Sequence, residues 1–283
     1  MTARPADFAR MHIAPDFASM ELLTARFWAH AYTRHVHDTF AIAVIEHGIE
    51  HFRCGAATCD APAGTVAVVP PGEVHDGERG CDAGWAYRVF YPRPELLADL
   101  MAELRDGDAR MPVFDRVVLD DPALFQALRD LHAALHTADD ALQRACAWRE
   151  AMAALLRHAG VREPDVGRDD AAVRAAQGLL RDDLAASLAL EDVARAVGLS
   201  PWHLNRVFSR SVGLPPHAWR NQWRLVQAKA LLRQGQLPAE VAAQLGYADQ
   251  PHLHRQFKRA FGVTPGAYAA ARKNVQDAAG MPS

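Results

Sequence analysis

Two stretches of eight residues near the C-terminus decide the fold of the second half of this chain. They are His203-Leu-Asn-Arg-Val-Phe-Ser-Arg210 and His252-Leu-His-Arg-Gln-Phe-Lys-Arg259. The two stretches match at an offset of 49 residues, and the match continues to Gly213 and its counterpart Gly262. A sequence repeat with this period predicts a duplicated structural unit.

Each copy predicts a helix, a tight turn and a second helix. In the first copy, a helix over 191–197 ends at Gly198. Ser200 is suited to cap the next helix, and Pro201 to occupy its first position. In the second copy, Asp249 is the expected cap. A helix-turn-helix motif has this form, and it places its second helix in the major groove of DNA.

One face of each predicted second helix carries side chains suited to base edges, whereas Leu204 and Phe208 fall on a core face. Arginine matches the two acceptors of guanine, and asparagine or glutamine matches adenine. The predicted base-reading residues are Trp202, Asn205, Arg206, Ser209, Gln250, His252, His254 and Arg255. Packing in the first helical turn is an open alternative for His252, and partial burial is one for Trp202.

Other basic residues of this region are better placed to contact phosphates, which hold the register without reading sequence. They are Arg210, Arg224, Lys258, Arg259, Arg272 and Lys273. Residues 187–275 contain twelve basic and four acidic residues, although the whole chain has a formal charge of −3. Residues 1–186 contain nineteen basic and twenty-nine acidic residues. This asymmetry indicates that the C-terminal part meets a polyanion.

A length of 283 residues, half of them apolar, suits two globular domains. We expect an N-terminal domain over 1–160, a polar linker over 161–170 and, within a segment 168–283 that is able to fold on its own, a helical domain over 171–275. Within the last, the two helix-turn-helix motifs are expected at about 191–212 and 238–261. The chain contains no apolar run long enough to span a bilayer, and the first residues do not resemble a secretory signal. A cytoplasmic protein is therefore expected.

Residues 28–92 predict β structure, because short apolar runs such as 40–45 and 65–69 are separated by turn signals. Helices are expected from Pro94 and over 121–159, which makes the fold class α+β. The second helix places leucines at spacings of four, three and four, and the third is expected to start at an Asp139 cap. The apolar positions of these two helices are Leu124, Leu128, Leu131, Leu135, Leu142, Cys146, Met152 and Leu156.

Three histidines are candidate site residues in the N-terminal domain. His35 and His37 share one face of an extended segment because side chains alternate there. His75 follows a turn at Pro70-x-Gly72. The three could bind zinc or iron, line the pocket of an organic effector, or be structural. The effector pocket is the interpretation we favour.

This layout resembles a cupin, a small β-barrel whose two motifs direct histidines inward. Metal-binding cupins also place a glutamate three or four residues after the second histidine. Ala41 and Ile42 stand there in this chain, so we expect no metal cofactor. Further candidate pocket residues are Glu46, Glu73, Trp85, Tyr87 and Arg88.

The segment from about 174 to 271 resembles the DNA-binding domain of AraC/XylS-type transcriptional regulators. The residues that carry the resemblance are 190–194, 198–201, His203, Leu204, Arg206, Phe208, 246–249, 257–259 and 261–265. The chain departs from the family pattern at Ser209, where a lysine is usual, and at Leu237-Pro238. The resemblance implies a cupin-like effector domain that dimerises through helices around 121–159.

The expected function is that of a sequence-specific, DNA-binding transcription regulator controlled by a small-molecule effector, and not that of an enzyme. The expected partners are double-stranded DNA, an effector, a second copy of the chain and RNA polymerase, and no membrane is expected. Two alternatives remain open. One is a metal-dependent cupin enzyme with an accessory helical domain, and the other is a DNA-binding regulator whose N-terminal domain only dimerises. The sequence identifies neither the effector nor the promoter, nor whether the outcome is activation or repression.

Overall fold

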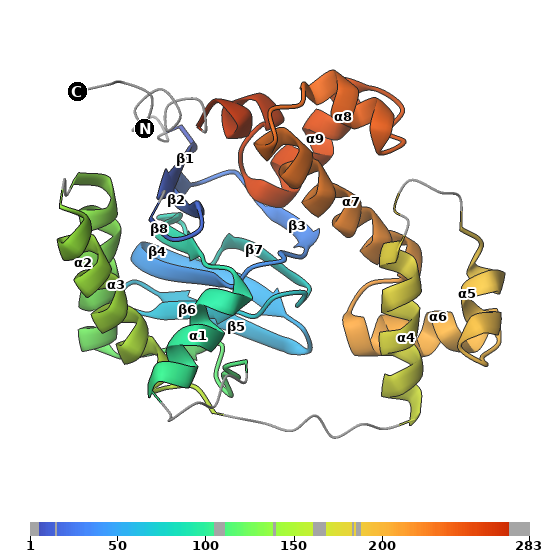
Figure 1. The fold of residues 1–283 in the computed structure, drawn as a ribbon, viewed down its shortest axis with the longest axis horizontal. Helices are drawn as coiled ribbons and strands as arrows, with labels where there is room; N and C mark the ends of the chain where they lie inside the picture. Colours follow the sequence, from blue (N-terminus) through green and yellow to red (C-terminus); the bar gives the residue numbers. More distant parts are fainter. Residues whose placement is uncertain are drawn as a thin grey trace.

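The computed structural model describes residues 6–14, 16–104, 111–137, 140–160, 168–182, 184 and 188–271. Sheets form the N-terminal part and helices the C-terminal part (Figure 1). The strands are β1 (Phe8–Ala14), β2 (Met20–Phe27), β3 (Tyr32–His35), β4 (Ala41–Cys54), β5 (Ala57–Pro62), β6 (Val66–Val69), β7 (His75–Arg79), β8 (Trp85–Tyr91) and β9 (Val118–Leu119). The helices are α1 (Pro94–Leu104), α2 (Pro122–Thr137), α3 (Ala141–Leu156), α4 (Arg168–Asp182), α5 (Leu190–Ala196), α6 (Pro201–Val212), α7 (Pro216–Arg233), α8 (Pro238–Gln244) and α9 (Gln250–Phe261).

The strands form a cupin-like barrel of two sheets that share the long strand β4. One sheet has the order β1-β2-β8-β4-β6-β9. In the other, β5 and β7 pair with β4, and β3 pairs with β7. The β structure begins at Phe8, earlier than the predicted start near residue 28. In β1 the buried Met11 and Ile13 alternate with Arg10 and His12, a period-2 pattern that the prediction did not use.

Strand β4 can serve both sheets because its register shifts between Ile45 and His47. Gly48 follows at once with a φ of +69°, a region that only glycine adopts freely. A Cβ atom at this position would lie 1.8 Å from the carbonyl oxygen of Gly84. The bulge therefore bends β4 at a point where two backbones come close together.

Helices α1 to α3 cover the outer face of the first sheet (Figure 1). Ile42 and Val44 of β4 face these helices, whereas Ala41, Ala43 and Ile45 face the barrel interior, as strand alternation requires. The four leucines predicted for the buried face of α2 are all buried, which confirms that pattern. They are Leu124, Leu128, Leu131 and Leu135.

Helix α3 departs from the prediction at its start. Its N-cap is Asp140, whose carboxylate accepts a hydrogen bond from the backbone N–H of Leu142 at 2.8 Å, and not Asp139, which lies outside the described residues. Leu142 is 71% exposed and Cys146 is also exposed, whereas Met152 and Leu156 are buried. Only the second half of α3 therefore packs on the barrel in the way that the predicted apolar face required.

The C-terminal part consists of two helix-turn-helix units joined by α7, with α5 and α6 as unit 1 and α8 and α9 as unit 2 (Figure 1). As predicted, Ser200 caps α6 and Asp249 caps α9, each accepting a hydrogen bond from a backbone N–H three residues on. Helix α4, which packs on unit 1, begins at Arg168, inside the segment predicted to be a linker.

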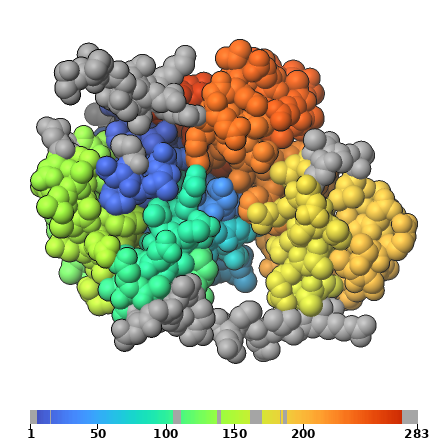
Figure 2. All heavy atoms as spheres, viewed as in Figure 1, coloured from blue at the N-terminus to red at the C-terminus, as the bar shows by residue number. Residues whose placement is uncertain are grey.

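The packing boundary of the molecule does not follow the boundary between the two halves of the chain. Leu231 of α7 and Phe257 of α9 belong to one apolar cluster with Leu23 and Val89 of the barrel. Unit 1 instead has a separate core around Phe208, joined at its edge by barrel residues. Both units lie against the barrel on the side opposite α2 and α3 (Figure 2). Among the described residues, no helix is both long enough and apolar enough to cross a membrane.

Candidate effector pocket and nucleic-acid interface

A small pocket of about 50 Å³ lies inside the barrel, beneath the C-terminal end of α9. Four of the predicted pocket residues line it: His35, His37, His75 and Tyr87. The other lining residues are Tyr32, Ala41, Ala43, Glu50, Phe52, Ala67, Val69, Asp76, Val89, Tyr91, Ala260 and Phe261. A mostly apolar wall with a few converging polar groups is typical of small-molecule sites.

The three histidines come together at one end of this pocket. Their ring centroids are 4.2 Å apart for His35 and His75, 4.8 Å for His35 and His37, and 5.0 Å for His37 and His75. All three are buried, and burial lowers the pKa of each, that of His75 to about 4. Near neutral pH the three rings are therefore uncharged, and each can accept a hydrogen bond or a metal ion on one nitrogen.

Tyr32 and Glu50 add polar groups that sequence reasoning missed, beside the predicted Tyr87. The hydroxyl groups of Tyr32 and Tyr87 are 2.7 Å apart in a hydrogen bond. Glu50 is buried in the wall, and burial raises the pKa of its carboxyl to about 8. Before the bulge of β4, the odd-numbered residues Ala41 and Ala43 face the pocket. After the bulge, the even-numbered residues Glu50 and Phe52 face it. Simple alternation across the bulge assigns Glu50 to the wrong face.

The other predicted pocket residues, Glu46, Glu73, Trp85 and Arg88, do not line this pocket. Arg88 donates a hydrogen bond from Nε to the carboxylate of Glu46 at 2.8 Å, and both line a separate groove. Glu73 lines a groove against α4. Trp85 is fully buried behind the pocket, with its ring 5.3 Å from that of Phe27.

The roof of the pocket comes from the second unit. The ring of Phe261, the last residue of α9, lies 5.7 Å from the ring of His37 and 6.2 Å from that of His35. The next residue, Gly262, lies so close to Tyr32 that an added Cβ would be 2.6 Å from its hydroxyl oxygen. An occupant of the pocket would thus touch the helix-turn-helix region directly.

A buried ionic cluster joins β2 to α7 beside this roof. Glu21 Oε2 is 2.8 Å from Lys229 Nζ, and Glu21 also pairs with Arg233 and accepts a hydrogen bond from the hydroxyl of Tyr268. Burial alone would raise the pKa of Glu21, but the charges of Lys229 and Arg233 outweigh it and lower the pKa to about 2. The carboxylate of Glu21 therefore stays ionised near neutral pH.

The predicted base-reading residues lie at the surface of α6 and α9. Trp202 is 70% exposed, and the guanidinium carbon of Arg206 lies 5.0 Å from the centre of its ring. His252 is half-buried, 5.5 Å from the ring of Tyr247 and in contact with Gln256. The residues of the set that are exposed are Trp202, Asn205, Arg206, Gln250, His254 and Arg255, and Ser209 is half-buried.

The predicted phosphate contacts separate into three groups. Arg210, Lys258 and Arg259 are exposed on the recognition helices. Arg224 is half-buried, and its Nε donates a hydrogen bond to the carbonyl oxygen of Leu184 at 2.7 Å. That contact holds the Arg224 side chain against its own domain. Arg272 and Lys273 lie outside the described residues.

Comparison with known families matches both halves of the chain. Residues 17–152 match the model of the AraC-like ligand binding domain, and residues 193–271 match a helix-turn-helix domain model. The chain belongs to the AraC/XylS family of transcriptional regulators. It is a regulator with an N-terminal ligand-binding domain and a C-terminal helix-turn-helix DNA-binding domain.

Curated relatives of this AraC/XylS-type chain are transcriptional regulators. The HTH-type transcriptional regulator YbfI of Bacillus subtilis is 28% identical over 229 residues, covering 78% of this chain and 81% of the relative. The transcriptional activator RhaS of Citrobacter koseri is 28% identical, covering 83% of this chain and 86% of the relative. Unsaturated-fatty-acid-bound ToxT of Vibrio cholerae has the same fold, with a TM-score of 0.56, 12% identity, and coverage of 95% and 97%.

Proposed function

We propose that this regulator binds a small-molecule effector in the barrel pocket, and that occupancy of the pocket changes how the two recognition helices meet DNA. The single observation that carries the proposal is the composition of the pocket wall. Ala260 and Phe261, which end the second recognition helix, line the same cavity as the barrel residues. If α9 moved relative to the barrel, an effector that touches Phe261 would bind the two positions of α9 with different affinity. A ligand shifts a conformational equilibrium only through such a difference.

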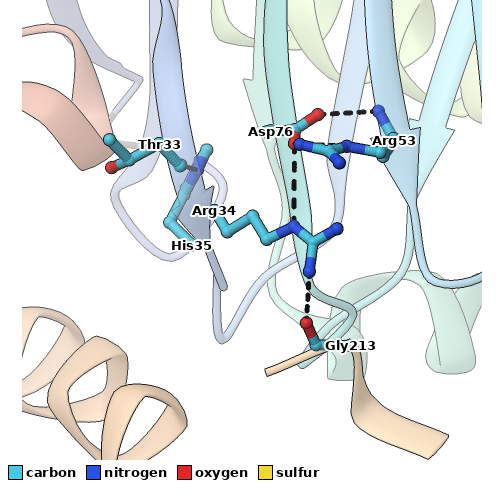
Figure 3. Close-up of polar contacts among 6 residues, drawn as sticks. All are labelled: Thr33, Arg34, His35, Arg53, Asp76 and Gly213. Atoms are coloured by element: carbon cyan, nitrogen blue, oxygen red, sulfur yellow. Dashed lines mark hydrogen bonds and ion pairs between the residues drawn. The ribbon is translucent and has the colours of Figure 1, made fainter. Parts of the chain in front are cut away.

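Strand β3 supports the proposal because it contacts both units. Tyr32 lies against Gly262, which caps α9, and Arg34 donates a hydrogen bond to the carbonyl oxygen of Gly213, which caps α6 (Figure 3). Tyr32 and His35 of this short strand also line the pocket. A shift of β3 on ligand binding would therefore reach both recognition helices.

The DNA-contacting residues proposed from the sequence keep their roles, with Arg206 and Arg255 as the chief base readers and Arg210, Lys258 and Arg259 as phosphate contacts. They lie on exposed faces of α6 and α9, where a groove of DNA can approach. For Arg224 the internal hydrogen bond to Leu184 argues for a structural role instead.

The experiment uses the full chain and a promoter fragment selected from random duplexes. A thermal-shift screen of small carboxylic acids, sugars and aromatic metabolites identifies a ligand, and DNA affinity is measured with and without it. Phe52→Trp, which fills the pocket from β4, should abolish the ligand response while DNA binding persists. A ligand that alters DNA affinity equally in wild type and Phe52→Trp would place the effector site elsewhere.

We also propose that the protein is a homodimer through α2 and α3. These helices cover the side of the barrel away from both units, and Leu142 of α3 is 71% exposed there. Sedimentation of wild type and Leu142→Glu tests this, since a dimer through α3 should dissociate in the variant. Dimers of equal strength in both would argue against this surface. Contact with RNA polymerase stays a prediction.

A further inference from the structure

Although the missing cupin glutamate led us to expect no metal cofactor, we infer that His35, His37 and His75 form a binding site for one divalent transition-metal ion of the zinc class at the end of the pocket. Each side chain offers one nitrogen, and the three nitrogens lie within 4.8 Å of one another. In a tetrahedral site with metal–nitrogen distances of about 2.0–2.1 Å, the ligand atoms are about 3.3 Å apart. Small rotations of the three side chains would bring the nitrogens to that spacing.

The hydrogen bonds of two of the histidines hold them ready to bind a metal. Nδ1 of His35 is 2.8 Å from the carbonyl oxygen of Thr33, a neighbour on the same strand (Figure 3). Nδ1 of His75 is 3.0 Å from the carbonyl oxygen of Glu73. A carbonyl oxygen only accepts, so Nδ1 carries the proton in both rings and Nε2 keeps its lone pair. Histidines that bind metals are oriented by this type of outer contact.

The third histidine contributes an unsatisfied atom. Nδ1 of His37 is buried and has no hydrogen-bond partner among the described residues. Buried polar atoms are seldom left unpaired, because removing them from water without a partner costs free energy. A bound ion in this part of the pocket would give His37 a partner in the ring plane.

The charges around the site fit a cation with open coordination positions. Three imidazole ligands leave the ion its full charge, and Asp76, whose carboxylate pairs with Arg53 at 2.6 Å, also lines the pocket. The nearby ammonium group of Lys229 is already paired with Glu21 at 2.8 Å. Three protein ligands leave at least one position for water or for an acceptor atom of the effector. The inference rests on the proposed function in one respect only, which is that it places the metal ion in the same pocket as the effector.

The test uses the full chain, stripped with a chelator and then dialysed against Zn²⁺ or Co²⁺. We expect about one ion per chain, and visible absorption bands from bound Co²⁺ that report nitrogen ligation. His37→Ala and His75→Ala should each weaken binding by at least about 100-fold, more than the loss of an outer contact does. His37→Gln, which keeps the size of the side chain, guards against a misfolded alanine variant. Unchanged stoichiometry and affinity in these variants would overturn the inference.

A second histidine cluster provides the matched control. The ring of His136 lies 4.3 Å from that of His12 and 4.7 Å from that of His132, on the other side of the sheet. His136→Ala should bind the ion as wild type does, and loss of binding in this variant alone would move the site there. Zn²⁺ should also raise the melting temperature of wild type and His136→Ala, but not of His37→Gln.

The failure of this inference can be told apart from the failure of the proposed function. If neither the wild type nor any variant binds Zn²⁺ or Co²⁺, while an organic ligand still changes DNA affinity, the metal site is wrong and the effector pocket stands. If one ion binds through the three histidines, but Phe52→Trp leaves the response of DNA binding to every pocket ligand unchanged, the metal site stands and the proposed coupling is wrong.

Discussion

Arg34 of strand β3 donates a hydrogen bond from its guanidinium group to the carbonyl oxygen of Gly213, the glycine that ends the first recognition helix. The same strand carries Tyr32, which lies against Gly262, the counterpart of Gly213 in the sequence repeat. One short strand of the sensor barrel therefore contacts equivalent caps of both DNA-reading helices. The duplication of the C-terminal unit gives the barrel two matched points of contact.

Replacing Arg34 with methionine should loosen unit 1 from the barrel without unfolding either. The hydrogen bond to Gly213 and the longer contact with Asp76 at 3.9 Å are lost, at a cost of about 1 kcal/mol for a partly exposed group. Hydrogen exchange should accelerate in the last turn of α6. Arg53→Met, which removes the other arginine from Asp76 but leaves Arg34 on Gly213, is the control and should leave that turn protected.

The two cap glycines should respond differently to alanine. Both have a positive φ, +82° for Gly213 and +72° for Gly262, so each substitution costs about 1–2 kcal/mol of backbone strain. At Gly213 an added Cβ meets nothing closer than 3.9 Å, whereas at Gly262 it would lie 2.6 Å from the Tyr32 hydroxyl. Denaturant unfolding should show the larger loss for Gly262→Ala. In a Tyr32→Ala background, the two alanine substitutions should differ less in the unfolding free energy that they cost. Equal losses in the wild-type background would mean that Tyr32 of β3 does not contact Gly262 in solution.

Arg206 and Arg259 should separate sequence reading from phosphate contact. Arg206→Ala should cost about 1–3 kcal/mol on the specific site and relax the base preference there. Arg259→Ala should weaken binding to specific and scrambled duplexes alike. It should also reduce the slope of log affinity against log salt concentration by about 1. Binding measured on both duplexes over a range of salt concentrations distinguishes them. Equal losses on both duplexes for Arg206→Ala would remove its base-reading role.

The buried cluster around Glu21 should make stability depend on acid. The folded-state pKa of Glu21 is lowered to about 2 from an ordinary value of 4.5, so its contribution is fully present above pH 4.5. That contribution is lost as the pH falls from 4.5 toward 2, where the folded state must also take up the proton.

Glu21→Gln should therefore destabilise the protein near neutral pH by about 3–5 kcal/mol, because Lys229 and Arg233 stay buried without their counter-charge. The free energy of unfolding of Glu21→Gln should also fall less between pH 4.5 and pH 2 (the acid limb of the curve) than that of wild type, when both are measured by denaturant unfolding from pH 2 to 7. Glu46→Gln, which breaks a partly exposed pair with Arg88, is the control and should keep the wild-type acid limb. An unchanged limb in Glu21→Gln would assign the acid sensitivity to other carboxylates.

Local signals accounted for the features that the sequence predicted well. The caps at Ser200 and Asp249 are satisfied within one helical turn, so they are visible in a few neighbouring residues. The leucine spacing of α2 and the repeat of the two units are likewise patterns along the chain. The convergence of His35, His37 and His75 was also accessible, because strand alternation and one turn place them.

Other parts of the candidate site had no local signal. The bulge in β4 changes which residues face inward, so Glu50 enters the pocket, whereas Glu46 lines a separate groove. Arg224 looked like a phosphate contact on a basic helix, but a carbonyl forty residues away holds it. The C-terminal domain was expected to fold on its own. In the structure, its residues Leu231 and Phe257 belong to an apolar cluster that includes residues of the barrel.

The sequence by itself therefore determined the duplicated DNA-binding units, the barrel and the three histidines, because periodicity, capping and turn chemistry act over a few residues. Tertiary structure alone decided that Phe261 closes the pocket, that Glu21 meets Lys229, and that β3 touches both recognition helices. Those contacts join residues some 200 positions apart. They depend on how the packed surfaces of two domains fit, and that fit leaves no pattern in either segment taken alone.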